Sequence, residues 1–120
     1  MDEHEAPITY FMNEEEIVLD LLLYKLSEDD KKKLRGLPEE DIQALHTDLG
    51  KALREHYRLV DQDNPYVVPG NSYHINYPDR MSLRVIFRAW VRLTGKPLSE
   101  TTHNLIYNIT PTPDPGSYAF

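Results

Sequence analysis

The residues best suited to chemistry in this chain are four arginines spaced four positions apart: Arg80, Arg84, Arg88 and Arg92. Guanidinium groups bind carboxylates and phosphates through paired hydrogen bonds. The spacing places the four side chains on one ribbon of a helix, each step rotated by about 40°. Like charges at this spacing destabilise a helix by about 0.2–0.5 kcal/mol per pair. Acidic groups must therefore offset them, either from this chain or from a partner.

The chain itself is the favoured source, because it has 20 acidic residues and surface ion pairs are common. The alternative is an external partner, and it defines a candidate contact surface. We predict that this surface binds another protein that presents acidic groups. Its members are the four arginines and polar aromatic residues of the loop 64–77, namely Tyr66, Tyr73, His74 and Tyr77.

The arginines lie on a predicted helix whose two ends carry clear signals. Asp79 is the expected N-cap, and Gly95 followed by Pro97 predicts the end of the helix. An apolar stripe centred on Trp90, the only tryptophan, is expected to face the core, with the arginines on the opposite side. The stripe consists of Leu83, Ile86, Phe87, Trp90, Leu93 and Thr94.

Three further helices are predicted before this one. Asn13 and Glu16 form a capping-box pattern ahead of a segment that is apolar nearly all round to Leu26, so we expect it to be buried between other helices. Ser27 caps a short helix that stops at Gly36. The longest helix is expected over residues 38–60. Its mid-helix Gly50 predicts close backbone contact with a neighbouring helix, in the layer of Trp90.

These elements predict a mainly α-helical bundle of about four helices, in a single domain over residues 1–110. The loop 61–78 is expected to cover one helix edge. Residues 99 and 100 predict a brief helical turn, and residues 104–109 look extended. A minor pairing of two strands, 8–12 with 104–109, is an open alternative. Residues 111–120 are rich in proline and are expected to form a C-terminal tail.

Three stretches of the sequence together resemble a family of small bacterial domains of unknown function. They are the segment 26–31, then Leu45-His46 with Leu49-Gly50 and Arg54, then Pro78-Asp79 with Met81-Ser82 leading to Arg92-Leu93 and Gly95-Lys96-Pro97. Order and spacing are similar over residues 21–98. Tyr77 departs from the pattern, which has histidine there. The resemblance implies a helical fold and no mechanism. Our function hypothesis places the protein in a bacterium or its phage.

Composition narrows the possible partners and the location. A net charge of −7 argues against direct nucleic-acid binding. The chain has no cysteine, which excludes disulfides and thiolate metal sites. Its most apolar run is too short to span a bilayer, so we expect no membrane partner. Residues 1–6 are acidic where a secretory signal would be basic, which predicts a cytoplasmic protein. A homo-oligomer is left open.

The sequence offers little for catalysis, and we expect no enzyme, no cofactor and no metal. His46 and His56 are ten residues apart, so they do not form the i, i+4 pair of a zinc protease helix. Neither a nucleophile elbow nor a glycine-rich phosphate loop is present. The leading hypothesis is a non-catalytic protein-interaction or regulatory module. One alternative is an acidic inhibitor that mimics nucleic acid, with acidic clusters at 14–16, 28–30 and 39–41. The other is a small metal-dependent hydrolase.

Overall fold

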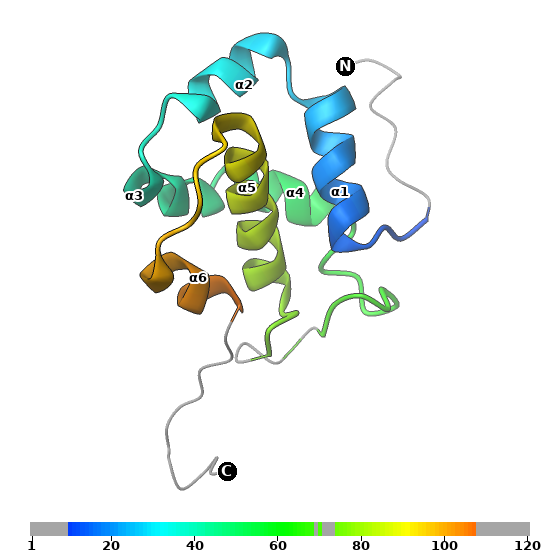
Figure 1. Cartoon of the computed structure of the whole chain (residues 1–120). Helices are drawn as coiled ribbons and strands as arrows, with labels where there is room; N and C mark the ends of the chain where they lie inside the picture. Colours follow the sequence, from blue (N-terminus) through cyan, green and yellow to red (C-terminus); the bar gives the residue numbers. More distant parts are fainter. Residues whose placement is uncertain (1–9, 69, 71–73, 108–120) are drawn as a thin grey trace, which may run out of the picture.

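Helix α5, which runs from Pro78 to Thr94, lies at the centre of the structure (Figure 1). The computed structural model describes residues 10–68, 70 and 74–107, and this part of the chain is mainly helical. Helices α1, α2, α4 and α6 all pack on α5. Figure 1 shows α1 and α6 on opposite sides of it.

The other elements are short and follow one another closely. Helix α1 covers Glu14–Asp20 and continues as a π-helical segment, η2, over Leu21–Lys25. Helix α2 covers Glu28–Arg35, α3 covers Glu39–Ile42, and a 3-10 segment, η3, covers Gln43–His46. Helix α4 covers Leu49–His56 and α6 covers Glu100–Tyr107. Among the described residues, every helix is too short or too polar to span a lipid bilayer.

Local capping signals account for several of these ends. The Asn13 side chain accepts a hydrogen bond from the Glu16 amide at 2.8 Å, and the Glu16 carboxylate accepts one from the Asn13 amide at 2.8 Å. This reciprocal pattern confirms the predicted capping box. Ser27 caps α2 as predicted. Gly95 ends α5 with φ at +75°, a conformation that glycine adopts without steric cost.

The predicted N-cap of α5 is wrong. Helix α5 begins at Pro78, with Tyr77 at the N-cap position and no side-chain hydrogen bond to the first turn. Proline suits the first helical position because its fixed φ is helical and its missing N–H would have had no helical partner. Asp79 instead lies 3.3 Å from the Arg54 guanidinium on α4.

The predicted long helix over residues 38–60 is also wrong, because α3, η3 and α4 replace it. The break falls at Thr47, whose hydroxyl donates to the carbonyl of Ala44 at 3.3 Å. Such side-chain bonds compete with the helical ladder. Gly50 follows the break and is buried. A Cβ at Gly50 would lie 3.1 Å from Nη1 of Arg54 and 3.6 Å from the Ser82 hydroxyl of α5. The tightest contact is therefore with the Arg54 side chain, and α5 is met at an ordinary contact distance at Ser82 and not at Trp90.

The C-terminal prediction of an extended segment is wrong for residues 104–107, which form the second half of α6. The Ser99 hydroxyl accepts from the Thr102 amide at 3.2 Å, which caps the first turn and supports a helix. The described residues contain no strand, so residues 10–12 do not form the predicted pairing. Residues 8, 9, 108 and 109 and the tail 111–120 lie outside the described part.

The core is built around Trp90, which is 2% exposed as predicted and donates its indole N–H to the carbonyl of Leu37 at 2.9 Å. Helix α5 is buried on more sides than its apolar stripe predicts, since Val85 and Ala89 are also buried. The segment α1–η2 is less buried than predicted. Its outer side exposes three large apolar side chains, Leu19, Leu23 and Tyr24.

Candidate functional site

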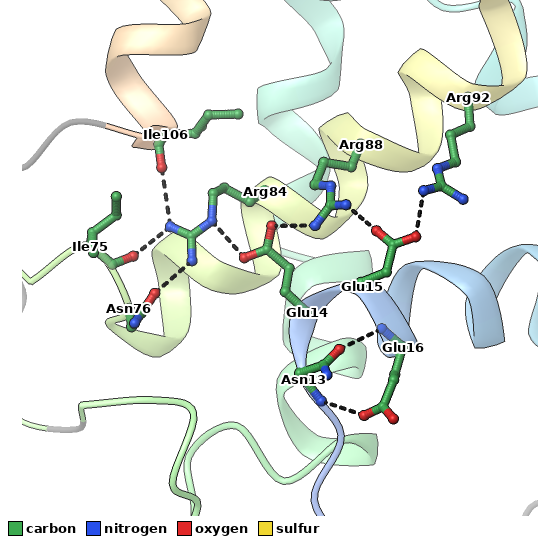
Figure 2. Close-up of polar contacts among 10 residues, drawn as sticks. All are labelled: Asn13, Glu14, Glu15, Glu16, Ile75, Asn76, Arg84, Arg88, Arg92 and Ile106. Atoms are coloured by element: carbon green, nitrogen blue, oxygen red, sulfur yellow. Dashed lines mark hydrogen bonds and ion pairs between the residues drawn. The ribbon is translucent and has the colours of Figure 1, made fainter.

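Arg84 lies at the meeting point of four segments of the chain (Figure 2). Its Nε donates to the Glu14 carboxylate at 2.7 Å. Its Nη1 donates to the carbonyls of Ile75 and Ile106, at 2.5 and 3.1 Å, and its Nη2 donates to Oδ1 of Asn76 at 3.0 Å. The side chain is only 4% exposed. The prediction that Arg84 faces outward is therefore wrong: it joins α1, the loop before α5, and α6.

Arg88 and Arg92 share the next carboxylate along α1. Arg88 donates through Nη1 to Glu14 at 2.9 Å and through Nη2 to Glu15. Arg92 donates through Nη2 to the other oxygen of Glu15 at 2.5 Å. Figure 2 shows the resulting chain of alternating charges from Arg84 to Arg92. For these three arginines, the acidic groups that offset the ribbon come from the protein itself.

The cap of α1 explains why the two glutamates reach α5. Asn13 fixes the first residue of α1, so Glu14 and Glu15 occupy its first turn. Carboxylates are favourable there because the helix N-terminus carries partial positive charge. Helix α1 packs on α5. Its first turn therefore meets the arginine ribbon from the side.

The acids do not fully neutralise the ribbon. Three guanidinium groups, Arg84, Arg88 and Arg92, face two carboxylates, so the cluster keeps one positive charge in a chain whose net charge is −7. Partial burial raises the pKa of Glu15, but the hydrogen bonds and charges of Arg92 and Arg88 outweigh it and hold that pKa below its usual range. Burial lowers the pKa of Arg88, and Glu14 and Glu15 more than offset it. Both partners thus stay charged at neutral pH.

The exposed end of the ribbon lines a hollow of about 410 Å³ between α5 and α6. Exposure increases along the ribbon, from 4% for Arg84 to 27% for Arg88 and 41% for Arg92. The rings of His103 and Tyr107 on α6 lie 4.6 Å apart, centre to centre. We call this hollow the α5–α6 hollow. Its lining includes Arg88, Arg92, His103 and Tyr107, with apolar Pro97 and Leu98.

The structure separates the remaining residues of the predicted contact surface from this hollow. Arg80 lines a different hollow, of about 190 Å³, together with His46 and Asp79. His74 accepts a hydrogen bond at Nδ1 from the amide of Asn76, 3.0 Å away, and Tyr66 is 40% exposed. Neither these two residues nor Tyr77 lines the α5–α6 hollow. Tyr73 lies outside the described residues.

Four residues of the site were not identified from the sequence. Glu14 and Glu15 were predicted as first-turn acids and as part of the acidic cluster 14–16, but not as partners of the arginines. Tyr107 belongs to the segment 104–109, which was expected to be extended, and His103 comes just before it. The i, i+4 spacing of His103 and Tyr107 was a signal, because it places both rings on one side of a helix. No comparable signal paired α1 with α5.

The arrangement is suited to holding anions by charge and hydrogen bonding. Arg88 and Arg92 donate to the two oxygens of Glu15, and guanidinium groups bind other carboxylates and phosphates through the same kind of hydrogen bond. No group of three or more histidine or acidic side chains that could hold a metal ion occurs among residues 10–68, 70 and 74–107. Comparison with protein-family models, with curated proteins and with solved structures finds no match for this chain.

Proposed function

We propose that this protein is a non-catalytic interaction module that binds an acidic segment of a partner protein in the α5–α6 hollow. The observation that carries the proposal is the placement of two partly exposed guanidinium groups, Arg88 and Arg92, beside apolar Pro97 and Leu98. Such a lining fits a peptide that has a carboxylate next to an apolar side chain. Leu98 packs against the core, so the apolar wall is anchored.

In this proposal, Glu15 competes with the partner for Arg88 and Arg92. Its two oxygens accept from Arg88 and Arg92, which are the groups that an incoming carboxylate needs. Its side chain is 44% exposed, so water and ions reach the pair and weaken it. A partner carboxylate therefore displaces Glu15 from one or both guanidinium groups. Partner binding is expected to be modest and to weaken as salt is added.

Charge and shape favour a protein partner over nucleic acid. The overall net charge of −7 repels a phosphate backbone, whereas a single acidic segment experiences mainly the local excess of arginine.

The acidic clusters give little support to the alternative of a nucleic-acid mimic, because several of their side chains are paired with basic side chains of the same chain. Glu28 lies 2.9 Å from Lys31, Asp29 lies 3.3 Å from Lys33, and Glu14 and Glu15 are paired with arginines.

A binding assay with one charged probe tests the proposal. The probe is a fluorescein-labelled peptide of glutamates around a single leucine. The control peptide has glutamine in place of each glutamate, so it lacks the negative charge. We expect Arg92→Ala to weaken binding about tenfold, because it removes one charge-assisted contact. Glu15→Gln should tighten binding, because it removes the competing charge while keeping the side-chain shape.

Lys96→Ala is the matched control. It removes the same charge just beyond the end of α5, from an exposed residue that does not line the hollow. Its affinity for the peptide should equal that of the unmodified protein. The proposal fails if the peptide does not bind to the folded protein, or if Arg92→Ala and Lys96→Ala weaken binding equally.

A further inference from the structure

The arginine cluster beside the α5–α6 hollow carries more positive charge than one carboxylate of a partner can balance. Three guanidinium groups of the ribbon face two carboxylates, and Glu15 is the carboxylate that a partner displaces. Once Glu15 is displaced, the three guanidinium groups face Glu14 alone, and the cluster carries two positive charges. An incoming carboxylate only restores the former balance, so this exchange gains little electrostatic energy. A group with two negative charges neutralises the cluster.

The hollow also offers more hydrogen-bond donors than a carboxylate has oxygens. Arg88 and Arg92 donate to the two oxygens of Glu15, and these contacts mark the places where two oxygens of a ligand can bind. His103 lines the same hollow from α6, and its side chain is exposed. An imidazole ring always has at least one N–H group. A ligand with a third oxygen can therefore accept hydrogen bonds from both helices.

The α6 wall of the hollow is held in place independently of Glu15. The His103 ring lies on the Tyr107 ring, with 4.6 Å between the ring centres and 33° between the ring planes. The guanidinium carbon of Arg84 lies 5.9 Å from the centre of the Tyr107 ring, a distance at which a cation is attracted to an aromatic ring. Arg84 also donates to the carbonyl of Ile106 at 3.1 Å. The residues that support His103 are thus tied to the buried end of the ribbon.

We propose that the partner presents a phosphorylated serine side chain to the α5–α6 hollow, an inference that rests on the function proposed above. Two phosphate oxygens take the positions of the Glu15 carboxylate on Arg88 and Arg92, and the third accepts a hydrogen bond from His103. A phosphate monoester carries a charge of about −1.5 to −2 at pH 7 and has three acceptor oxygens, so it matches both the charge and the donors. An unphosphorylated acidic segment binds by the same exchange, but more weakly.

A phosphorylated protein fits this site better than a phosphodiester does. Each phosphodiester group of a nucleic acid carries a single negative charge, so it gains no more than a carboxylate gains. A series of such groups also meets the repulsion of a chain whose net charge is −7. Pro97 and Leu98 provide apolar surface in the same hollow, which suits an apolar residue next to the phosphoserine.

Fluorescence anisotropy of the full chain with two labelled peptides tests the inference. One is the glutamate peptide of the binding assay, and the other has phosphoserine in place of one glutamate next to the leucine. At pH 7.4 we expect the phosphopeptide to bind about tenfold more tightly, which is the effect of one added charge-assisted hydrogen bond. At pH 5 most of the phosphate carries one charge, because its second pKa is about 6, so the advantage should fall to about twofold. Protonation of His103 over this range strengthens the binding of both peptides, so the ratio of their affinities is the quantity to compare.

His103→Phe is the diagnostic variant, because it keeps a ring on Tyr107 and removes the nitrogen donor. At pH 7.4 it should abolish most of the advantage of the phosphopeptide and leave the affinity for the glutamate peptide unchanged. The residue is exposed, so the fold should tolerate the change. Arg92→Ala should weaken the binding of both peptides. Lys96→Ala, the matched control, should change neither affinity.

The possible outcomes separate this inference from the proposed function. Equal affinities for the two peptides at pH 7.4 would overturn the inference and leave the proposed function in place. An advantage that persists in full at pH 5, or in His103→Phe, would have the same consequence. Binding of neither peptide would overturn both proposals. Inorganic phosphate that binds as tightly as the phosphopeptide would overturn the assignment to a protein partner, because a free anion would then be sufficient.

Discussion

Replacement of Arg84 by alanine tests the internal role of the arginine ribbon. The change removes the side chain that joins α1, the loop before α5, and α6. It leaves the carbonyls of Ile75 and Ile106 without their guanidinium donor. It also leaves Glu14 with Arg88 as its remaining cation. The resulting loss combines a broken buried ion pair with unsatisfied polar groups.

The size of the effect follows from burial. Removing one partner of a buried ion pair costs about 3–5 kcal/mol. For a chain of 120 residues, each 1 kcal/mol lowers the melting temperature by about 4 °C. We therefore expect Arg84→Ala to lower the melting temperature by about 12–20 °C. That is a large part of the stability of a typical domain, which is about 5–15 kcal/mol.

Thermal unfolding followed by circular dichroism measures this loss. Arg92→Ala is the control, because Arg92 belongs to the same ribbon but is 41% exposed. Its melting temperature should fall by less than about 4 °C, since exposed ion pairs contribute little. Equal and small shifts for both variants would refute the burial argument, since they would mean that Arg84 is not tied to the core in solution.

Two further predictions concern α1. Asn13→Ala should lower the free energy of unfolding by about 1 kcal/mol, because it removes the cap that positions Glu14 and Glu15. This loss is measurable as a fall of about 4 °C in melting temperature. An unchanged melting temperature would mean that another group replaces the cap. Loss of hydration raises the pKa of Glu15, but its contacts with Arg92 and Arg88 lower that pKa by more, so the net shift is downward. The ionised Glu15 side chain therefore stabilises the fold fully above about pH 4.3, the ordinary pKa of glutamate. This stabilisation is lost as the pH falls through the lower pKa that Glu15 has in the folded protein. Urea denaturation between pH 3 and 6 should show a smaller acid loss for Glu15→Gln than for the unmodified protein, and parallel curves would contradict this.

The parts of the fold that the sequence predicted are those with a local cause. Asn13 and Glu16 cap α1 through bonds between residues three apart, and Gly95 ends α5 by its own backbone freedom. The burial of Trp90 follows from the period of the apolar stripe. These features depend on a few neighbouring residues, so a single sequence is enough to show them.

The parts that it did not predict depend on contacts between distant segments. Nothing near Arg84 indicates that Glu14, 70 positions earlier, will lie beside it. First-turn acids are sufficiently explained by the helix dipole, so Glu14 and Glu15 carried no further signal. The break before α4 and the helical state of residues 104–107 were missed for related reasons. Competing side-chain bonds at Thr47 and tertiary burial of Ile106 outweighed local propensity.

We propose that the exposed end of the arginine ribbon, Arg88 and Arg92, binds acidic groups of a partner, whereas the buried end at Arg84 does not. The most direct measurement is NMR of the arginine Nε–H resonances during titration with the glutamate-rich peptide. We predict that the signals of Arg88 and Arg92 shift with peptide concentration and that the signal of Arg84 stays in place. Shifts confined to Arg84 or Arg80, or no arginine shift at saturating peptide, would contradict the claim.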